Sequence, residues 1–245
     1  MALHFLLDDP ASAAIGDTVV LTGAEAHHAA TVRRVRVGEE VTVGDGRGAW
    51  LTGLCESVAP REVVVRVTAR TDAAAPRPRI VLVQALAKGD RDELAIQAAT
   101  ELGIDEIVPW QAARSVSRWD AAKAQKGRAR WAAIAREAAK QAHRAWLPEV
   151  GELVTTKELA RRAAVARVLV LEPTAPESLT ALDLRGDPDR DVVLVVGPEG
   201  GIALEELAAL AGAGATLVRL GDTVLRTSTA GPAALSVVSA ALGRW

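Results

Sequence analysis

Residues 191–201 read DVVLVVGPEGG, a run of five consecutive apolar residues that passes at once into a glycine-rich loop. Three further segments have the same apolar character, namely RIVLVQALA at 79–87, ARVLVLEP at 166–173 and ATLVRLG at 215–221. Strands of consecutive Val, Ile and Leu are typical of parallel sheets that are covered on both faces. These segments therefore predict an α/β domain with a mostly parallel sheet.

Helical segments are expected between these strands, as an α/β architecture requires. Apolar periodicity and stop signals place helices over 92–103, 120–146, 203–211 and 229–243, and IDEIVPW at 104–110 is expected to form a further strand. In such sheets, ligands bind beyond the carboxyl ends of the strands. The loops that follow the strands are therefore the expected place for chemistry.

The first part of the chain has a different pattern, with short alternating strands and turn residues. VTVGDGRGAWLTGLCESV at 41–58 alternates around Asp45-Gly46 as a hairpin does, and REVVVRVTAR at 61–70 continues the alternation. A small β-barrel or sandwich is expected here. DAAAPRPR at 72–79 has no periodicity and reads as a linker. We therefore expect two domains, residues 1–72 and residues 73–245.

Composition excludes several classes of protein. The chain has 245 residues, of which 49% are hydrophobic, so it can bury a core and is not dominated by disorder. Residues 227–243 form a charge-free run that is too short and too polar to span a membrane. The single cysteine, Cys55, cannot form an internal disulfide, and no Cys or His cluster predicts a metal site. We expect a cytoplasmic protein without metal.

Positive charge is concentrated in one segment although the net charge of the chain is −2. Residues 110–146 carry nine basic and two acidic residues, and also four of the six tryptophans. Basic charge interleaved with aromatic residues is typical of nucleic-acid binding. A helix whose tryptophans pack inward while its Arg and Lys face solvent would have the same pattern.

Common catalytic motifs are absent from the sequence, which contains no GxGxxG after a strand, GxxxxGK[ST], GxSxG or HExxH. Three loops remain. In Gly197–Gly201 the glycines permit close approach to a ligand, although a tight turn with an exposed Glu199 is an alternative. Leu220-Gly221 alone reads as a turn. Residues 225–232, LRTSTAGP, open the last helix, where hydroxyls either cap the helix or help to form an anion site beside Arg226.

Together these loops resemble the ribosomal small subunit methyltransferase E family, in the SPOUT class of knotted methyltransferases. The resemblance rests on GPEGG, the following LG, and LRT-x-TA. It extends in order through Lys88-Gly89, Glu93, Gln97, Glu101-Leu102-Gly103, Ile107, Pro109, Arg114-Ser115, Trp131, Ile134, Glu137-Ala138, Gln141, Arg144 and Pro148. Before the linker it includes His28, Val32-Arg33-Arg34, Gly38 and Asp45-Gly46.

The resemblance implies an N-terminal PUA-like β-barrel that binds RNA and a C-terminal α/β domain with a trefoil knot that binds S-adenosyl-L-methionine. It implies methyl transfer to N3 of a uridine in 16S rRNA of the small ribosomal subunit, by a homodimer. Two alternatives are a SPOUT enzyme acting on another RNA such as tRNA and a non-enzymatic RNA-binding module.

The matching loops indicate the site residues. The expected cofactor-binding residues are Leu171, Glu172, Gly197, Pro198, Glu199, Gly200, Gly201, Leu220, Gly221, Leu225, Thr227, Thr229 and Ala230. Arg226 is the expected catalytic cation, close to the charge that develops on O2 or O4 of the uracil. The expected RNA contacts are His28, Arg33, Arg34, Arg36, Lys88, Arg91 and Arg114.

The chain also departs from the family at three positions. Ser228 stands where the family usually has Glu, His4 stands where Arg is common, and Ala98 stands where Lys is common. A carboxylate role at position 228 is therefore not available in this chain.

Overall fold

The computed structural model describes residues 3–7, 12–186 and 189–245, and it divides into two compact units. The first unit contains Met1–Ala75 together with Ala139–Leu147, and the second contains Pro76–Ala138 and Pro148–Trp245. This division differs from the expected domains 1–72 and 73–245, chiefly because a late segment of the chain belongs to the first unit.

The first unit is built on a five-stranded sheet with the order β1-β3-β4-β5-β2. Its strands are β1 (Leu3–Leu6), β2 (Thr18–Thr22), β3 (Glu40–Gly44), β4 (Ala49–Ala59) and β5 (Glu62–Asp72). The hairpins β3–β4 and β4–β5 form where the alternating pattern predicts them. A short helix α1 (Gly23–His27) continues into a π-helical turn, η1 (His28–Val32). Alternate strand residues such as Val41, Val43 and Leu51 are fully buried in the core of this unit.

The late segment, residues 139–147, joins the first unit through backbone and side-chain hydrogen bonds. Gly48 donates its N–H to the carbonyl of Ala145 at 3.0 Å, and Leu147 donates its N–H to Gly46 at 2.9 Å. The indole Nε1 of Trp146 donates to the carbonyl of Ala73 at 2.9 Å. Because these partners are distant in sequence, a boundary drawn from composition assigns the segment to the other domain.

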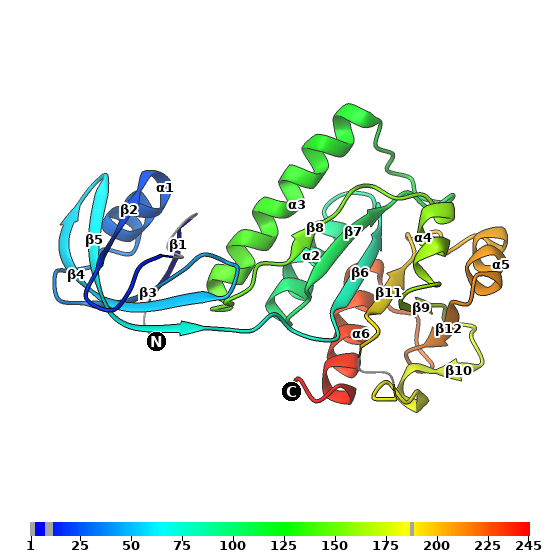
Figure 1. Ribbon diagram of the computed structural model, residues 1–245. Coiled ribbons are helices and arrows are strands. Elements are labelled where there is room, and N and C mark those ends of the chain that lie inside the picture. Colours follow the sequence, from blue (N-terminus) through cyan, green and yellow to red (C-terminus); the bar gives the residue numbers. More distant parts are fainter. Residues whose placement is uncertain (1–2, 8–11, 187–188) are drawn as a thin grey trace. The chain divides into compact units, whose positions relative to one another are not determined.

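The second unit contains a seven-stranded sheet with the order β10-β12-β9-β11-β6-β7-β8, in which every pairing is parallel (Figure 1). Its strands are β6 (Ile80–Ala85), β7 (Glu106–Trp110), β8 (Glu149–Val150), β9 (Arg167–Leu171), β10 (Glu177–Ser178), β11 (Val192–Val196) and β12 (Thr216–Arg219). The predicted α/β class with a parallel sheet is therefore confirmed.

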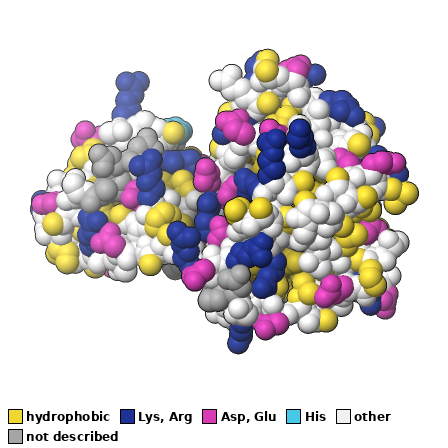
Figure 2. Space-filling model, turned by 45° about the vertical axis from the view of Figure 1, so that its right-hand side comes forward, with side chains coloured by type: hydrophobic (Ala, Val, Ile, Leu, Met, Phe, Trp, Pro, Cys, Tyr) yellow, Lys and Arg dark blue, Asp and Glu magenta, His cyan; other side chains and the backbone are white. Residues whose placement is uncertain are grey.

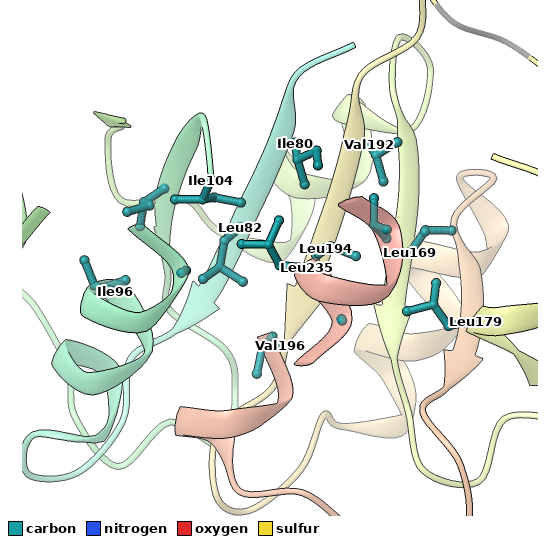
Figure 3. Packing of buried hydrophobic residues seen from close by; sticks show 14 of the residues in the cluster. Ile80, Leu82, Ile96, Ile104, Leu169, Leu179, Val192, Leu194, Val196 and Leu235 are labelled. Carbon is teal, nitrogen blue, oxygen red and sulfur yellow. The ribbon is translucent and has the colours of Figure 1, made fainter. Parts of the chain in front are cut away.

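Helices cover both faces of this sheet, and the alternation of strand residues decides which face each side chain joins. The helices are α2 (Arg91–Glu101), α3 (Ala121–Gln141), α4 (Thr156–Arg162), α5 (Leu204–Gly212) and α6 (Thr227–Ala241), with a 3₁₀ turn η2 (Leu179–Ala181). Leu82 and Leu194 pack with Ile96 of α2 and Leu235 of α6 on one face (Figure 3). The intervening strand residues, such as Val83 and Val193, pack on the other face with Leu159 of α4 and Leu210 of α5.

Helix α3 ends at Gln141, five residues before the expected end at 146. The N–H of His143 bonds to the carbonyl of Lys140, and the N–H of Arg144 bonds to the carbonyl of Ala139. This pair of bonds is the Schellman arrangement that ends many helices, in which the residue at the position of His143 is left-handed. His143 has φ +52°. The sequence carries no glycine there to signal the stop.

Within the described ranges, no helix is both long and apolar enough to cross a membrane.

Candidate functional site

A pocket of about 410 Å³ opens in the second unit where β9, β11 and β12 end and α6 begins. Its lining consists of Arg91, Leu171, Glu172, Pro173, Val196, Gly197, Pro198, Glu199, Gly201, Ile202, Val218, Arg219, Leu220, Thr223, Val224, Leu225, Arg226, Thr227 and Ala230. The volume lies in the range of cofactor-sized sites. Carboxyl ends of parallel strands are the expected place for such a site, and the three predicted loops meet there.

The glycine-rich loop after β11 contributes to this pocket mainly through backbone. A Cβ atom at Gly197 would lie 2.6 Å from Cγ1 of Ile202, so only glycine fits without displacing that side chain. Gly201 has φ +72°, a left-handed conformation that favours glycine. Gly200 lies outside the lining, and its carbonyl accepts a 3.2 Å hydrogen bond from Nη1 of Arg114.

A buried hydrogen-bond chain joins the start of α6 to two neighbouring strands. Oγ1 of Thr227 donates to the carbonyl of Gly197 at 2.8 Å and accepts from Nε2 of Gln84 at 2.9 Å. Gln84 is fully buried and has no contact with solvent, and Thr227 is only 6% exposed. The Thr227 hydroxyl therefore ties three segments of the pocket wall together, and it does not cap the helix as one sequence interpretation supposed.

Replacing Thr227 with valine should destabilise the protein by about 1–3 kcal/mol, because the Gly197 carbonyl and a Gln84 N–H would lose a buried partner. Replacing it with serine keeps the hydroxyl and should cost less than the valine change. Urea unfolding of both variants measures the difference. Equal destabilisation by serine and valine would show that the hydrogen-bond chain contributes little.

Glu199 links the glycine-rich loop to the loop between β6 and α2. One carboxylate oxygen, Oε1, accepts from the N–H of Lys88 and from Nη1 of Arg91, both at 2.9 Å. Partial burial acts to raise the pKa of Glu199, but the hydrogen bonds from its own backbone, Lys88 and Arg91 outweigh it and lower the pKa. The carboxylate is thus ionised and already engaged, and it holds Arg91 at the pocket.

Arg226 is the N-cap residue of α6 and lines the pocket with an exposed side chain. Its guanidinium makes no hydrogen bond or ion pair with any residue that the structure describes. A cation without a protein partner at the edge of a pocket is available to a bound ligand. Of the other expected cofactor-binding residues, Gly200, Gly221 and Thr229 lie outside the lining, and the remaining ten line it.

The expected RNA contacts fall into both units. Arg91 lines the large pocket, Arg114 bonds to Gly200, and Lys88 is exposed. His28 and Arg33 line a smaller pocket in the first unit. Arg34 and Arg36 are exposed and lie outside both linings. Figure 2 shows Lys and Arg side chains on the surface of each unit, interspersed with Asp and Glu.

Seven lining residues escaped the sequence interpretation, namely Pro173, Val196, Ile202, Val218, Arg219, Thr223 and Val224. Each lies within three residues of an expected one, so widening the predicted loops would have found them. Arg219 is fixed by a 2.9 Å hydrogen bond from Nη1 to the carbonyl of Ala175 and by a second bond to the carbonyl of Pro176. Its role could not be read from the motif.

Comparison with known proteins agrees with this arrangement. Residues 74–239 match a family model described as RNA methyltransferase domain, and residues 21–67 match one described as RNA methyltransferase PUA domain. The two matches define an RNA methyltransferase with an N-terminal PUA domain. The methyltransferase match covers most of the second unit, which contains the pocket.

The relatives identify the family. The chain is 46% identical to ribosomal RNA small subunit methyltransferase E of Mycobacterium tuberculosis, over 94% of this chain and 89% of the relative. It is 32% identical to the protein of the same name from Bacillus subtilis, over 91% and 90%. The crystal structure of the Neisseria gonorrhoeae protein of that name, bound to S-adenosyl methionine, superposes with a TM-score of 0.87 at 27% identity, covering 98% of both chains. The chain belongs to the ribosomal RNA small subunit methyltransferase E family.

Proposed function

We propose that this chain transfers a methyl group from S-adenosyl-L-methionine to N3 of a specific uridine in 16S rRNA of the small ribosomal subunit. The observation that carries the proposal is the convergence of the three motif loops on one pocket, with Arg226 at its edge and without a partner among the described residues. Arg91 and Arg219 line the same pocket, but Arg91 is paired with Glu199 and Arg219 bonds to the carbonyls of Ala175 and Pro176, which leaves Arg226 as the cation without a described partner.

The pocket fits S-adenosyl-L-methionine in size and in chemistry. Its wall combines apolar side chains such as Leu171, Leu220 and Ala230 with exposed backbone of the glycine-rich loop, which suits an adenine ring and its polar edge. The residues that would hold the cofactor are the ten expected ones that line the pocket. When bound, the cofactor supplies an electrophilic methyl group on a sulfonium, a reaction that requires no metal.

The side chains of this chain then have two tasks toward the uridine. Arg226 would stabilise the negative charge that develops on O2 or O4 when N3 loses its proton. Lys88, Arg91 and Arg114 would hold the RNA so that N3 lies in line with the methyl group, since proximity and orientation supply much of the rate. No residue is assigned as the proton acceptor.

Three further elements belong to the proposal. The enzyme acts as a homodimer. It acts in the cytoplasm, where small ribosomal subunits are found. Its second unit contains a trefoil knot. Sedimentation of the purified protein tests the dimer.

The decisive experiment uses small ribosomal subunits from cells that lack the corresponding gene. The purified protein is incubated with these subunits and labelled S-adenosyl-L-methionine, and the modified nucleotide is mapped by mass spectrometry. One N3-methyluridine in 16S rRNA is the expected product. Methylation of tRNA in its place would transfer the proposal to another RNA. RNA binding without any methyl transfer would leave a non-enzymatic binding module.

A further inference from the structure

The first unit contains a second pocket, of about 180 Å³, which is not part of the methyl-donor site. It is lined by Leu3, His4 and Phe5 of β1, by His28 and Arg33 at the two ends of η1, and by Lys140, Gln141 and His143 at the end of α3. Among the described residues, none of the lining side chains is acidic. The volume is below the usual range for a drug-sized ligand and suits a small anionic group.

Uncommon backbone conformations surround this pocket. His28 begins a π-helical turn and Arg33 directly follows it, and this rare element is frequent at functional sites. His143 has φ +52° at the helix-ending position where glycine is usual, and Arg34, which follows Arg33, has φ +55°. Non-glycine residues in this conformation store strain, which tends to be kept where the side chain has a function.

Of the basic side chains that line the pocket, only some form ion pairs or hydrogen bonds with described residues of the protein. Lys140 forms an ion pair with Glu25 at 2.8 Å, with 4% of the Lys140 side chain exposed. The guanidinium of Arg33 makes neither a hydrogen bond nor an ion pair with a described residue, although the backbone N–H of Arg33 bonds to the carbonyl of His28. The ring of His143 makes no hydrogen bond to a described residue. Arg33 and His143 therefore retain donors that a ligand could use.

His4 also lines this pocket and is held by contacts on its ring. Its ring stacks on Trp50 with centroids 4.1 Å apart and planes 6° apart, and its Nδ1 lies 3.0 Å from Oγ1 of Thr42. Burial, together with the nearby His143 and Lys140, lowers the pKa of His4 to about 4, so the ring is neutral near pH 7. The His143 ring lies 5.7 Å away.

We propose that this pocket binds a backbone phosphate of the RNA substrate, with Arg33 from the turn and His143 from the end of α3 as its ligands. The inference rests on the proposed function, because it assumes that RNA is the substrate. It adds a contact from the late segment of the chain, outside residues 21–67 that match the PUA family model.

Binding of labelled 16S rRNA transcript to the full chain tests the proposal, in a series of salt concentrations. Arg33→Gln should weaken binding about tenfold and should reduce the slope of log K against log salt by about 0.7, the loss expected for one phosphate contact to single-stranded RNA. His143→Gly should weaken binding several-fold while the melting temperature stays equal or rises, since glycine suits the left-handed position. A purely structural role would lower both together.

Arg61→Gln is the matched control, because it removes an exposed arginine of the same unit outside the pocket. Equal effects of Arg33→Gln and Arg61→Gln on RNA affinity would overturn the proposal. Competition by inorganic phosphate for the RNA is expected in the parent and should be weaker in Arg33→Gln. If phosphate binds without competing with RNA, the pocket takes a free anion and the proposal fails. Methyl transfer by the parent, measured separately, decides the proposed function whichever result is found.

Discussion

Replacing Gly197 with valine should lower the affinity for S-adenosyl-L-methionine by about a hundredfold, which corresponds to about 2.7 kcal/mol of binding free energy. The added Cβ would lie 2.6 Å from Cγ1 of Ile202, and the β-branched isoleucine has few rotamers in which to retreat. The loop must therefore move, and both Gly197 and Ile202 line the donor pocket. Isothermal titration calorimetry with the purified protein measures the loss.

Gly200→Ala is the matched control in the same loop. A Cβ at Gly200 would meet only atoms of Arg114, the nearest being its Cβ at the ordinary distance of 3.4 Å, and Gly200 does not line the pocket. Donor affinity should stay within about threefold of the parent, a change of less than 1 kcal/mol. Circular dichroism verifies that both variants are folded. A folded Gly197→Val variant with parental affinity would refute the assignment of this pocket to the donor.

Replacing Arg226 with glutamine should lower kcat about a hundredfold to a thousandfold, the typical cost of removing a donor that stabilises developing negative charge. The side chain lines the pocket without a partner among the described residues, so its removal leaves no buried group unsatisfied. The Kd for S-adenosyl-L-methionine and the melting temperature should change little. Arg226→Lys keeps the positive charge and should recover part of the rate.

Single-turnover methylation of small ribosomal subunits separates these effects. A loss confined to kcat, with partial rescue by lysine, is the expected pattern for a residue that acts in the transition state. A large rise in the donor Kd with an unchanged rate at saturation would instead make Arg226 a binding residue.

Five of the seven strands of the second unit, β6, β7, β9, β11 and β12, can be predicted because each lies in an apolar run between clear turn signals. Helix α4 was missed although Thr155 and Glu158 form a capping box that the sequence displays. Strands β8 and β10 have only two residues each, which is too short for any periodicity. The end of α3 cannot be predicted from the sequence because His143 stands where glycine usually marks the stop.

The loops of the candidate site could be predicted because glycines and a helix start occur directly after strands. The contacts between these loops could not be predicted, because each contact joins residues that are far apart in sequence. Glu199 bonds to Lys88 and Arg91 across more than a hundred positions, and Gln84 bonds to Thr227 across 143. A single sequence carries no signal for such pairs, so Gln84 was read only as part of a buried strand.

The first unit is built from two separate segments of the chain, so it cannot be separated from the second unit by a single cut in the sequence. Residues 1–75 by themselves lack Ala145, Trp146 and Leu147, whose bonds complete the surroundings of Gly46 and Gly48. A gene fragment cut at the linker would therefore encode an incomplete first unit. The first unit is not encoded by one continuous stretch, because its segment 139–147 lies inside residues 74–239 that match the methyltransferase model. A chimera between relatives therefore needs to exchange residues 139–147 along with the N-terminal sheet.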